Sequence, residues 1–192
     1  MQPALPLNVT LTWDLLVIVF AAVITTYSFI VGRKESYKII LATYVAAVAV
    51  HAASGLLSWL LGHSEHLLVL LGLPSQAPLI GAIRLLLFVA CIIVLTIRGG
   101  ISVDMEEIGG LADIAFTAGA GFATAGLLLV ILLTSIAGSP LLDPAMSTSP
   151  TLVPLLAQSR LAMALAEQQA FWFCLPAGLL IANGILSAKN ED

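Results

Sequence analysis

Three ionisable side chains lie within or beside long apolar stretches, where a charge is costly and therefore informative. Arg84 interrupts the otherwise apolar residues 77–97, and His51 lies inside a second apolar stretch. Asp14 stands at the start of a third. A charged group inside lipid needs a partner, a water-filled cavity or a route to the surface. Arg84 and His51 are therefore candidate intramembrane polar residues, and Asp14 is the candidate counter-charge.

Arg84 has three competing interpretations. About seven residues separate it from the start of its stretch, which corresponds to about 10 Å along a helix. Its side chain can snorkel over such a distance to the lipid headgroups. It can instead pair with Asp14 inside a helical bundle, or it can line a path for a substrate or ion. His51 is interpreted either as a hydrogen-bonded packing residue or as part of the same path.

The composition indicates what kind of fold holds these residues. The chain has 192 residues, of which 60% are hydrophobic and only 9% are charged, whereas soluble domains are about 25% charged. This composition predicts an all-α, polytopic bundle of transmembrane helices. The net charge of −4 gives no support to nucleic-acid binding. Cys91 and Cys174 lie in apolar runs and are expected to be reduced packing residues.

Crossing a bilayer takes about 20 helical residues. The first four apolar stretches meet this requirement directly. The fifth contains Pro176, Asn183 and Gly184, which a packed transmembrane helix tolerates. We therefore predict one integral membrane domain with four to five spans, at residues 15–31, 39–61, 77–97, 114–136 and 170–188.

Basic residues orient these spans. Lys and Arg favour cytoplasmic loops, and most of the basic residues fall at alternate connections: Arg33, Lys34, Lys38, Arg98 and Lys189. The N-terminal residues hold no Lys or Arg, so we expect no signal peptide and a retained first span. The pattern predicts a multi-pass protein of the cell inner membrane, with its N-terminus outside and its C-terminus in the cytoplasm.

The connections differ in character. Residues 138–169 are predicted to form an outer loop followed by an interfacial helix over residues 151–169. Residues 98–113 are expected to contain a short helix between two glycine pairs. His63 and His66 are three residues apart, but we interpret them as part of a polar turn, since a metal site needs more ligands. No metal and no cofactor are predicted.

A run of small residues, TAGAGFATAG at residues 117–126, predicts a close helix–helix contact. Thr117 and Thr124 can hydrogen-bond across it. The contact is either internal to the chain or a face for self-association. The residues of this candidate packing face are Thr117, Gly119, Gly121, Ala125 and Gly126.

Residues 13–50 resemble the colicin V production protein family of small bacterial inner-membrane proteins. The matching features are an acidic residue that opens the first span and a Gly-Arg pair that closes it, followed by a basic loop and a second span: Asp14, Tyr27, Phe29, Gly32 and Arg33. The resemblance implies a role in colicin V production or export and in envelope homeostasis. It supplies no catalytic residues.

The sequence contains no nucleotide-binding loop, nucleophile elbow or paired metal-ligand motif. We therefore expect a non-enzymatic membrane protein that acts in envelope maintenance or secretion. Its expected partners are the lipid bilayer and either a membrane-protein partner, to which it is an accessory subunit, or further copies of itself. The alternative is a small channel or transporter whose polar path involves Arg84 and His51.

Overall fold

The computed structural model describes residues 13–62, 76–99 and 110–189. The described residues form helices joined by short turns, with no strand among them. His63 and His66 fall outside the described residues, as does most of the short helix expected between the two glycine pairs.

Five helices of the described chain are long and apolar enough to cross a membrane. Each of the five predicted spans lies within one of these helices. The sequence predicted four to five spans, and the described structure has five such helices. The helices are α1 (Trp13–Val31), α2 (Arg33–Gly62), α4 (Gln76–Arg98), α5 (Gly110–Ala137) and α8 (Gln169–Lys189).

The fifth helix, α8, continues through Pro176 without a break. A proline inside a helix removes one backbone hydrogen bond, so neighbouring groups must stabilise that region. The Tyr44 hydroxyl of α2 donates a hydrogen bond to the carbonyl of Phe173, one turn before the proline. The Tyr44 and Phe173 rings also lie 6.4 Å apart. These contacts hold the proline-containing part of α8 against α2.

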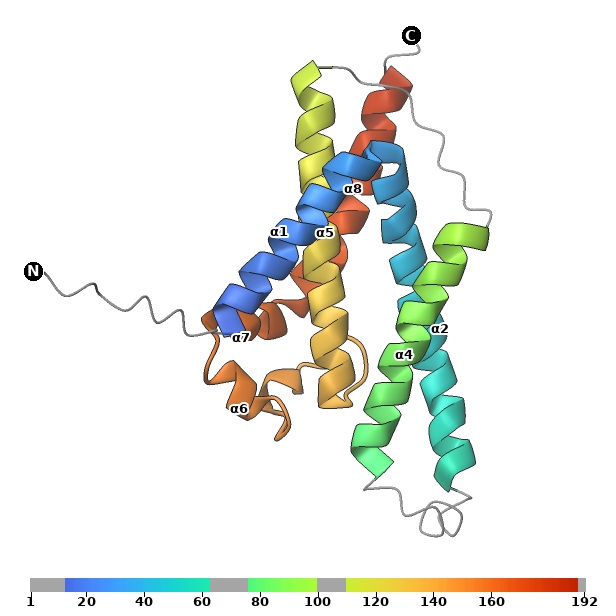
Figure 1. The fold of residues 1–192 in the computed structure, drawn as a ribbon, viewed down its shortest axis with the longest axis vertical. Helices are drawn as coiled ribbons and strands as arrows, with labels where there is room; N and C mark the ends of the chain where they lie inside the picture. The colour runs from blue at the N-terminus through green and yellow to red at the C-terminus, as the bar shows by residue number, and fades with distance from the viewer. Residues whose placement is uncertain (1–12, 63–75, 100–109, 190–192) are drawn as a thin grey trace, which may run out of the picture.

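The five long helices run in alternating directions (Figure 1). The end of α1, the starts of α2 and α5 and the end of α8 lie toward one end of the bundle. The start of α1 and the short helices after α5 lie toward the other. An odd number of alternating helices places the start of α1 and the end of α8 at opposite ends.

A single residue, Gly32, separates α1 from α2. Its φ of +90° lies in the left-handed region, which glycine adopts without strain. The Ser36 hydroxyl donates to the Gly32 carbonyl at 2.8 Å, and the Gly32 amide donates to the Ser28 carbonyl at 2.9 Å. These bonds satisfy backbone groups that a helix reversal would otherwise leave open. The glycine therefore permits an abrupt turn between two long helices.

The central helix of the bundle is α5, which contacts α1, α2, α4 and α8. In the most apolar part of α5, 72% of the residues are buried inside the protein, whereas the corresponding fraction is 6% for α1 and for α4. Its sequence explains the difference, because small residues in its first half admit close neighbours and larger apolar residues fill its second half. The other long helices therefore surround α5.

The segment after α5 differs from the single interfacial helix that the sequence predicts. It forms a 3-10 turn and two short helices: η1 (Met146–Thr148), α6 (Val153–Leu156) and α7 (Arg160–Glu167). Buried side chains of all three pack against the last turns of α5 in one core cluster, which includes Met146, Leu156, Leu165, Leu129 and Leu133. The segment is a folded cap on the bundle.

Candidate functional site

Arg84 lies on α4 and is half-buried. Its Nη1 donates a hydrogen bond to the carbonyl of Ser139 at 3.2 Å, just beyond the end of α5. The two helices approach closely here, since a Cβ added to Gly81 would lie 3.2 Å from the Ser135 carbonyl oxygen. The C-terminal end of a helix carries a partial negative charge that attracts cations. The guanidinium therefore binds the carbonyl end of α5.

The structure brings Arg84 and His51 to one cavity between α2, α4 and the end of α5. The cavity has a volume of about 20 Å³. A volume of about 10–15 Å³ on this measure holds one water molecule, so the cavity accommodates one small group. Its lining combines apolar and hydroxyl-bearing side chains: Ala47, Val50, Phe88, Ile131, Thr134, Ser135, Ser139 and Leu141, together with His51 and Arg84.

Two hydrogen-bond donors beside this cavity are not used within the described part of the chain. They are Nε of Arg84 and Oγ of Ser139, both buried. The other two hydroxyls of the lining are occupied, because Thr134 donates to the carbonyl of Val130 and Ser135 to that of Ile131, each at 2.8 Å. Both donors belong to residues that line the cavity, whose surface is otherwise mainly apolar.

Asp14 does not pair with Arg84. Its Oδ1 accepts hydrogen bonds from the Ser159 hydroxyl at 2.6 Å and from the Leu161 amide at 3.1 Å. Ser159 is also the N-cap of α7, because its Oγ accepts from the Ala162 amide at 3.0 Å. A carboxylate at a helix N-terminus is favoured by the helix dipole and by the free amides there. Asp14 therefore fixes the start of α1 to the start of α7.

The small-residue face of α5 is covered by helices of the same chain. A Cβ added to Gly121 would lie 2.8 Å from Oγ of Ser28 on α1, and one added to Gly126 would lie 1.9 Å from the Trp172 ring on α8. Gly119 lies opposite Leu179 of α8, with more room, and Ala125 is fully buried.

The threonines of this face bond within their own helix and make no use, within the described part of the chain, of the cross-helix possibility raised by the sequence. Thr117 donates to the Asp113 carbonyl at 2.8 Å, and Thr124 donates to the Ala120 carbonyl at 2.7 Å. The glycines let the helices approach each other closely. The threonine hydroxyls donate their hydrogen bonds to backbone carbonyls one turn earlier in the same helix. The described structure therefore uses this face for packing inside the chain.

An ion pair between a buried arginine and a partly exposed aspartate was not anticipated from the sequence. Nη1 of Arg33 lies 3.2 Å from Oδ1 of Asp113, and the Arg33 side chain is only 4% exposed. The pair joins the start of α2 to the first turn of α5. In the sequence, both residues lie near the ends of apolar stretches. This position predicts that the two side chains lie at a similar depth in the bundle, but it does not predict that they pair.

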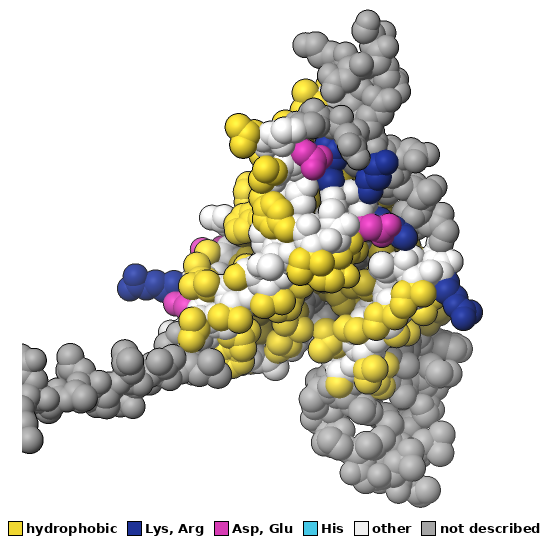
Figure 2. Space-filling view, turned by 45° about the horizontal axis from the view of Figure 1, so that its top comes forward, with side chains coloured by type: hydrophobic (Ala, Val, Ile, Leu, Met, Phe, Trp, Pro, Cys, Tyr) yellow, Lys and Arg dark blue, Asp and Glu magenta, His cyan; other side chains and the backbone are white. Residues whose placement is uncertain are grey.

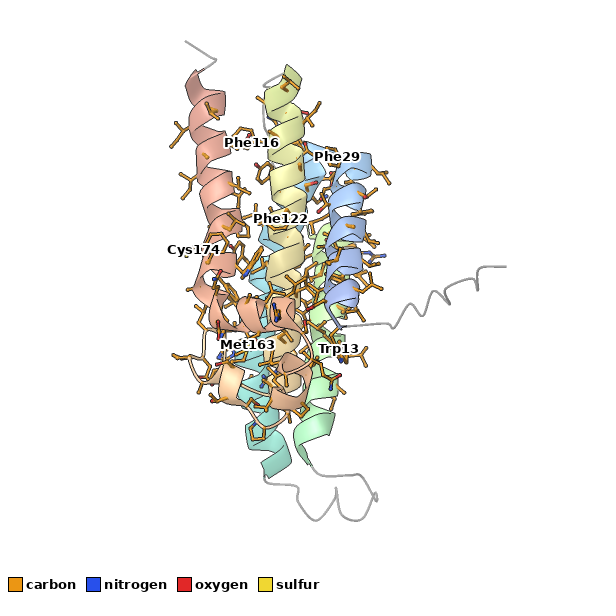
Figure 3. The ribbon with its side chains drawn as sticks, turned by 90° about the vertical axis from the view of Figure 1, so that its left-hand side faces the viewer. Trp13, Phe29, Phe116, Phe122, Met163 and Cys174 are labelled. Atoms are coloured by element: carbon orange, nitrogen blue, oxygen red, sulfur yellow. The ribbon has the colours of Figure 1, made fainter. Side chains whose placement is uncertain are left out.

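An apolar groove lies on another face, where α1, α5, α7 and α8 meet. Its volume is about 340 Å³, and its lining includes Val17, Phe122, Leu165 and Trp172. Figure 3 shows α5 between α1 and α8, with Trp13 and Met163 toward the same end of the bundle. The Phe122 and Trp172 rings lie 5.4 Å apart. Nothing in the sequence pattern predicts this groove, because its walls come from four separate segments.

Among the described residues, no three His, Cys, Asp or Glu side chains form a group that could hold a metal ion. Cys91 is half-buried and Cys174 is exposed, and both are free thiols.

These features define an all-α bundle with five helices that are long and apolar enough to cross a membrane. No family model, curated protein or solved structure matches the chain.

Proposed function

We propose that the five long helices cross the inner membrane of a bacterial cell, with the N-terminus outside and the C-terminus in the cytoplasm. Basic residues support this orientation, because Arg33, Lys34, Arg98 and Lys189 all lie at the helix ends that would face the cytoplasm. The face seen in Figure 2 is mainly apolar, with charged side chains in a few separate groups. Such a surface suits contact with lipid chains.

Within that membrane, we propose a non-enzymatic accessory subunit similar to the colicin V production family, with a role in envelope maintenance or secretion. The observation that supports this role is that different helices provide the internal contacts and the outward apolar surface. The small-residue face of α5 is used internally, whereas α1 and α4 present large apolar side chains outward, among them Val23, Ile30, Leu86 and Val94. On this proposal, a membrane-protein partner would dock on α1 or α4, and lipid would cover the remaining apolar surface.

Site-specific photo-crosslinking in intact cells tests this proposal. A photoreactive residue replaces Leu86 or Val94 on the outward face of α4, and Ile181 on α8 serves as the exposed control position. We expect one adduct of defined mass from α4 and none from α8. Deleting the gene should also sensitise cells to detergent, and wild-type protein should restore resistance. Uniform lipid-only labelling at all three positions, with unchanged detergent resistance, would contradict the proposal.

A small channel or transporter is the second candidate, since Arg84 and His51 line one cavity. Proteoliposomes separate the two candidates. A transporter produces ion flux that is lost in Arg84→Leu while the variant still inserts, whereas an accessory subunit gives no flux in either form.

A further inference from the structure

We propose that the cavity beside Arg84 binds one compact anionic group, either a halide ion or a single oxygen of a lipid phosphate. Both ligands share the chemistry of a small, negatively charged hydrogen-bond acceptor. The inference concerns binding alone and does not depend on the envelope role or on transport.

The first argument is charge. Within the described part of the chain, Arg84 has no carboxylate within 4.0 Å, whereas Arg33 has Asp113 and Lys38 has Glu35. Its polar contact is the carbonyl of Ser139, and the end of a helix supplies only about half a charge. A half-buried guanidinium with so little compensation attracts an anion from its surroundings.

The second argument is the direction of hydrogen bonding. Nε of Arg84 and Oγ of Ser139 are buried donors without partners among the described residues, and both residues line the cavity. Nε can only donate, so a ligand that reaches it must accept. The lining residues Val50, Phe88 and Ile131 are apolar, and low polarity strengthens a charge-assisted hydrogen bond. The chemistry of the cavity therefore favours an anion over a cation.

The third argument is size. A volume of about 20 Å³ accepts a group close to one water molecule. A chloride or bromide ion fits this limit. A whole phosphate does not fit, but one of its oxygens can enter while the remainder stays outside. A lipid phosphate can come near Arg84, because Arg84 is the ninth residue of α4 and lies about 12 Å from the start of that helix. The Arg84 side chain also extends toward the end of α5.

The test begins with the thermal midpoint of unfolding of delipidated protein in detergent. Chloride replaces gluconate at constant ionic strength, so that only anion identity changes. Ligand binding to the folded state raises the midpoint until the site saturates. Ser139→Ala removes one donor and should weaken the apparent chloride affinity about fivefold to tenfold. Arg84→Gln should abolish the chloride response. Arg98→Gln, at the exposed end of the same helix, is the matched control and should respond like the wild type.

The lipid source is tested in nanodiscs that contain phosphatidylcholine with or without phosphatidylglycerol. Native mass spectrometry should show a retained phosphatidylglycerol on the wild type and on Arg98→Gln, and loss of that lipid from Arg84→Gln. Chloride stabilisation without lipid retention assigns the site to a free anion, and the reverse result assigns it to lipid. A midpoint independent of chloride together with equal lipid retention in all variants would overturn the proposal. If Arg84→Gln does not fold, the Ser139→Ala comparison decides alone.

Discussion

The three ionisable residues singled out by the sequence lie at two places in the structure. Arg84 binds the carbonyl end of α5 and faces a small cavity with unused donors. His51 lies at the same cavity. Asp14 is engaged elsewhere, with the amide end of α7. Two of these residues thus sit at opposite kinds of helix terminus, a cation at a carbonyl end and an anion at an amide end, as helix dipoles favour.

Removing the Asp14 carboxylate should loosen the cap formed by η1, α6 and α7. Asp14→Ala deletes the acceptor for the Ser159 hydroxyl and the Leu161 amide, and so removes two hydrogen bonds between α1 and the start of α7. We expect faster proteolysis within residues 138–169 and little change in helix content by circular dichroism. Asp14→Asn keeps one acceptor oxygen and should be intermediate. Equal proteolysis rates in all three proteins would refute the role assigned to Asp14.

At the scale of elements, α5 determines how closely the bundle packs. Two of its glycines, Gly121 and Gly126, face α1 and α8 at distances that leave no room for a Cβ atom. The hydrophobic effect does not drive helices together inside lipid, so close van der Waals contact between helices carries more of the packing energy there. The three cap elements complete the core around the second half of α5, where its side chains become large.

Gly126→Ala should therefore destabilise the contact between α5 and α8. The added methyl group would overlap the Trp172 ring, and overpacking of this kind costs about 1–3 kcal/mol. Gly178→Ala is the matched control, because nothing lies within 4 Å of its added Cβ. Thermal unfolding in detergent should show a lowered midpoint for Gly126→Ala only. Equal midpoints for the two variants would mean that Trp172 moves aside freely.

At the scale of the whole molecule, the alternating directions of five helices fix the relation between the two ends of the chain (Figure 1). The start of α1 and the end of α8 lie at opposite ends of the bundle. Four basic residues, Arg33, Lys34, Arg98 and Lys189, lie at the helix ends on one side of this alternation, which under the orientation proposed above is the cytoplasmic side.

Reporter fusions test this arrangement directly. Alkaline phosphatase fused before residue 1 should be active, because it would lie outside, and green fluorescent protein fused after residue 192 should fluoresce in the cytoplasm. Reversing the two fusions should abolish both signals. A C-terminal phosphatase that is active would show that the chain crosses the membrane an even number of times, or in the opposite orientation.

Hydropathy and length alone predicted an all-α fold with four to five long helices, because an apolar stretch of about 20 residues needs no distant partner to form a helix in lipid. The structure showed that the fifth stretch, which contains Pro176, is also a long helix. The run of small residues likewise indicated a close contact on α5. Which helix fills that contact was decided only by tertiary structure, since Ser28 and Trp172 meet it from opposite ends of the chain. The same holds for Asp14 with Ser159 and for Arg84 with Ser139, pairs separated by 145 and 55 positions. The sequence shows that a charged side chain in a hydrophobic stretch needs a partner. Its depth along the helix restricts the candidate partners to residues at a similar depth. Which of these candidates is the partner depends on how the helices pack.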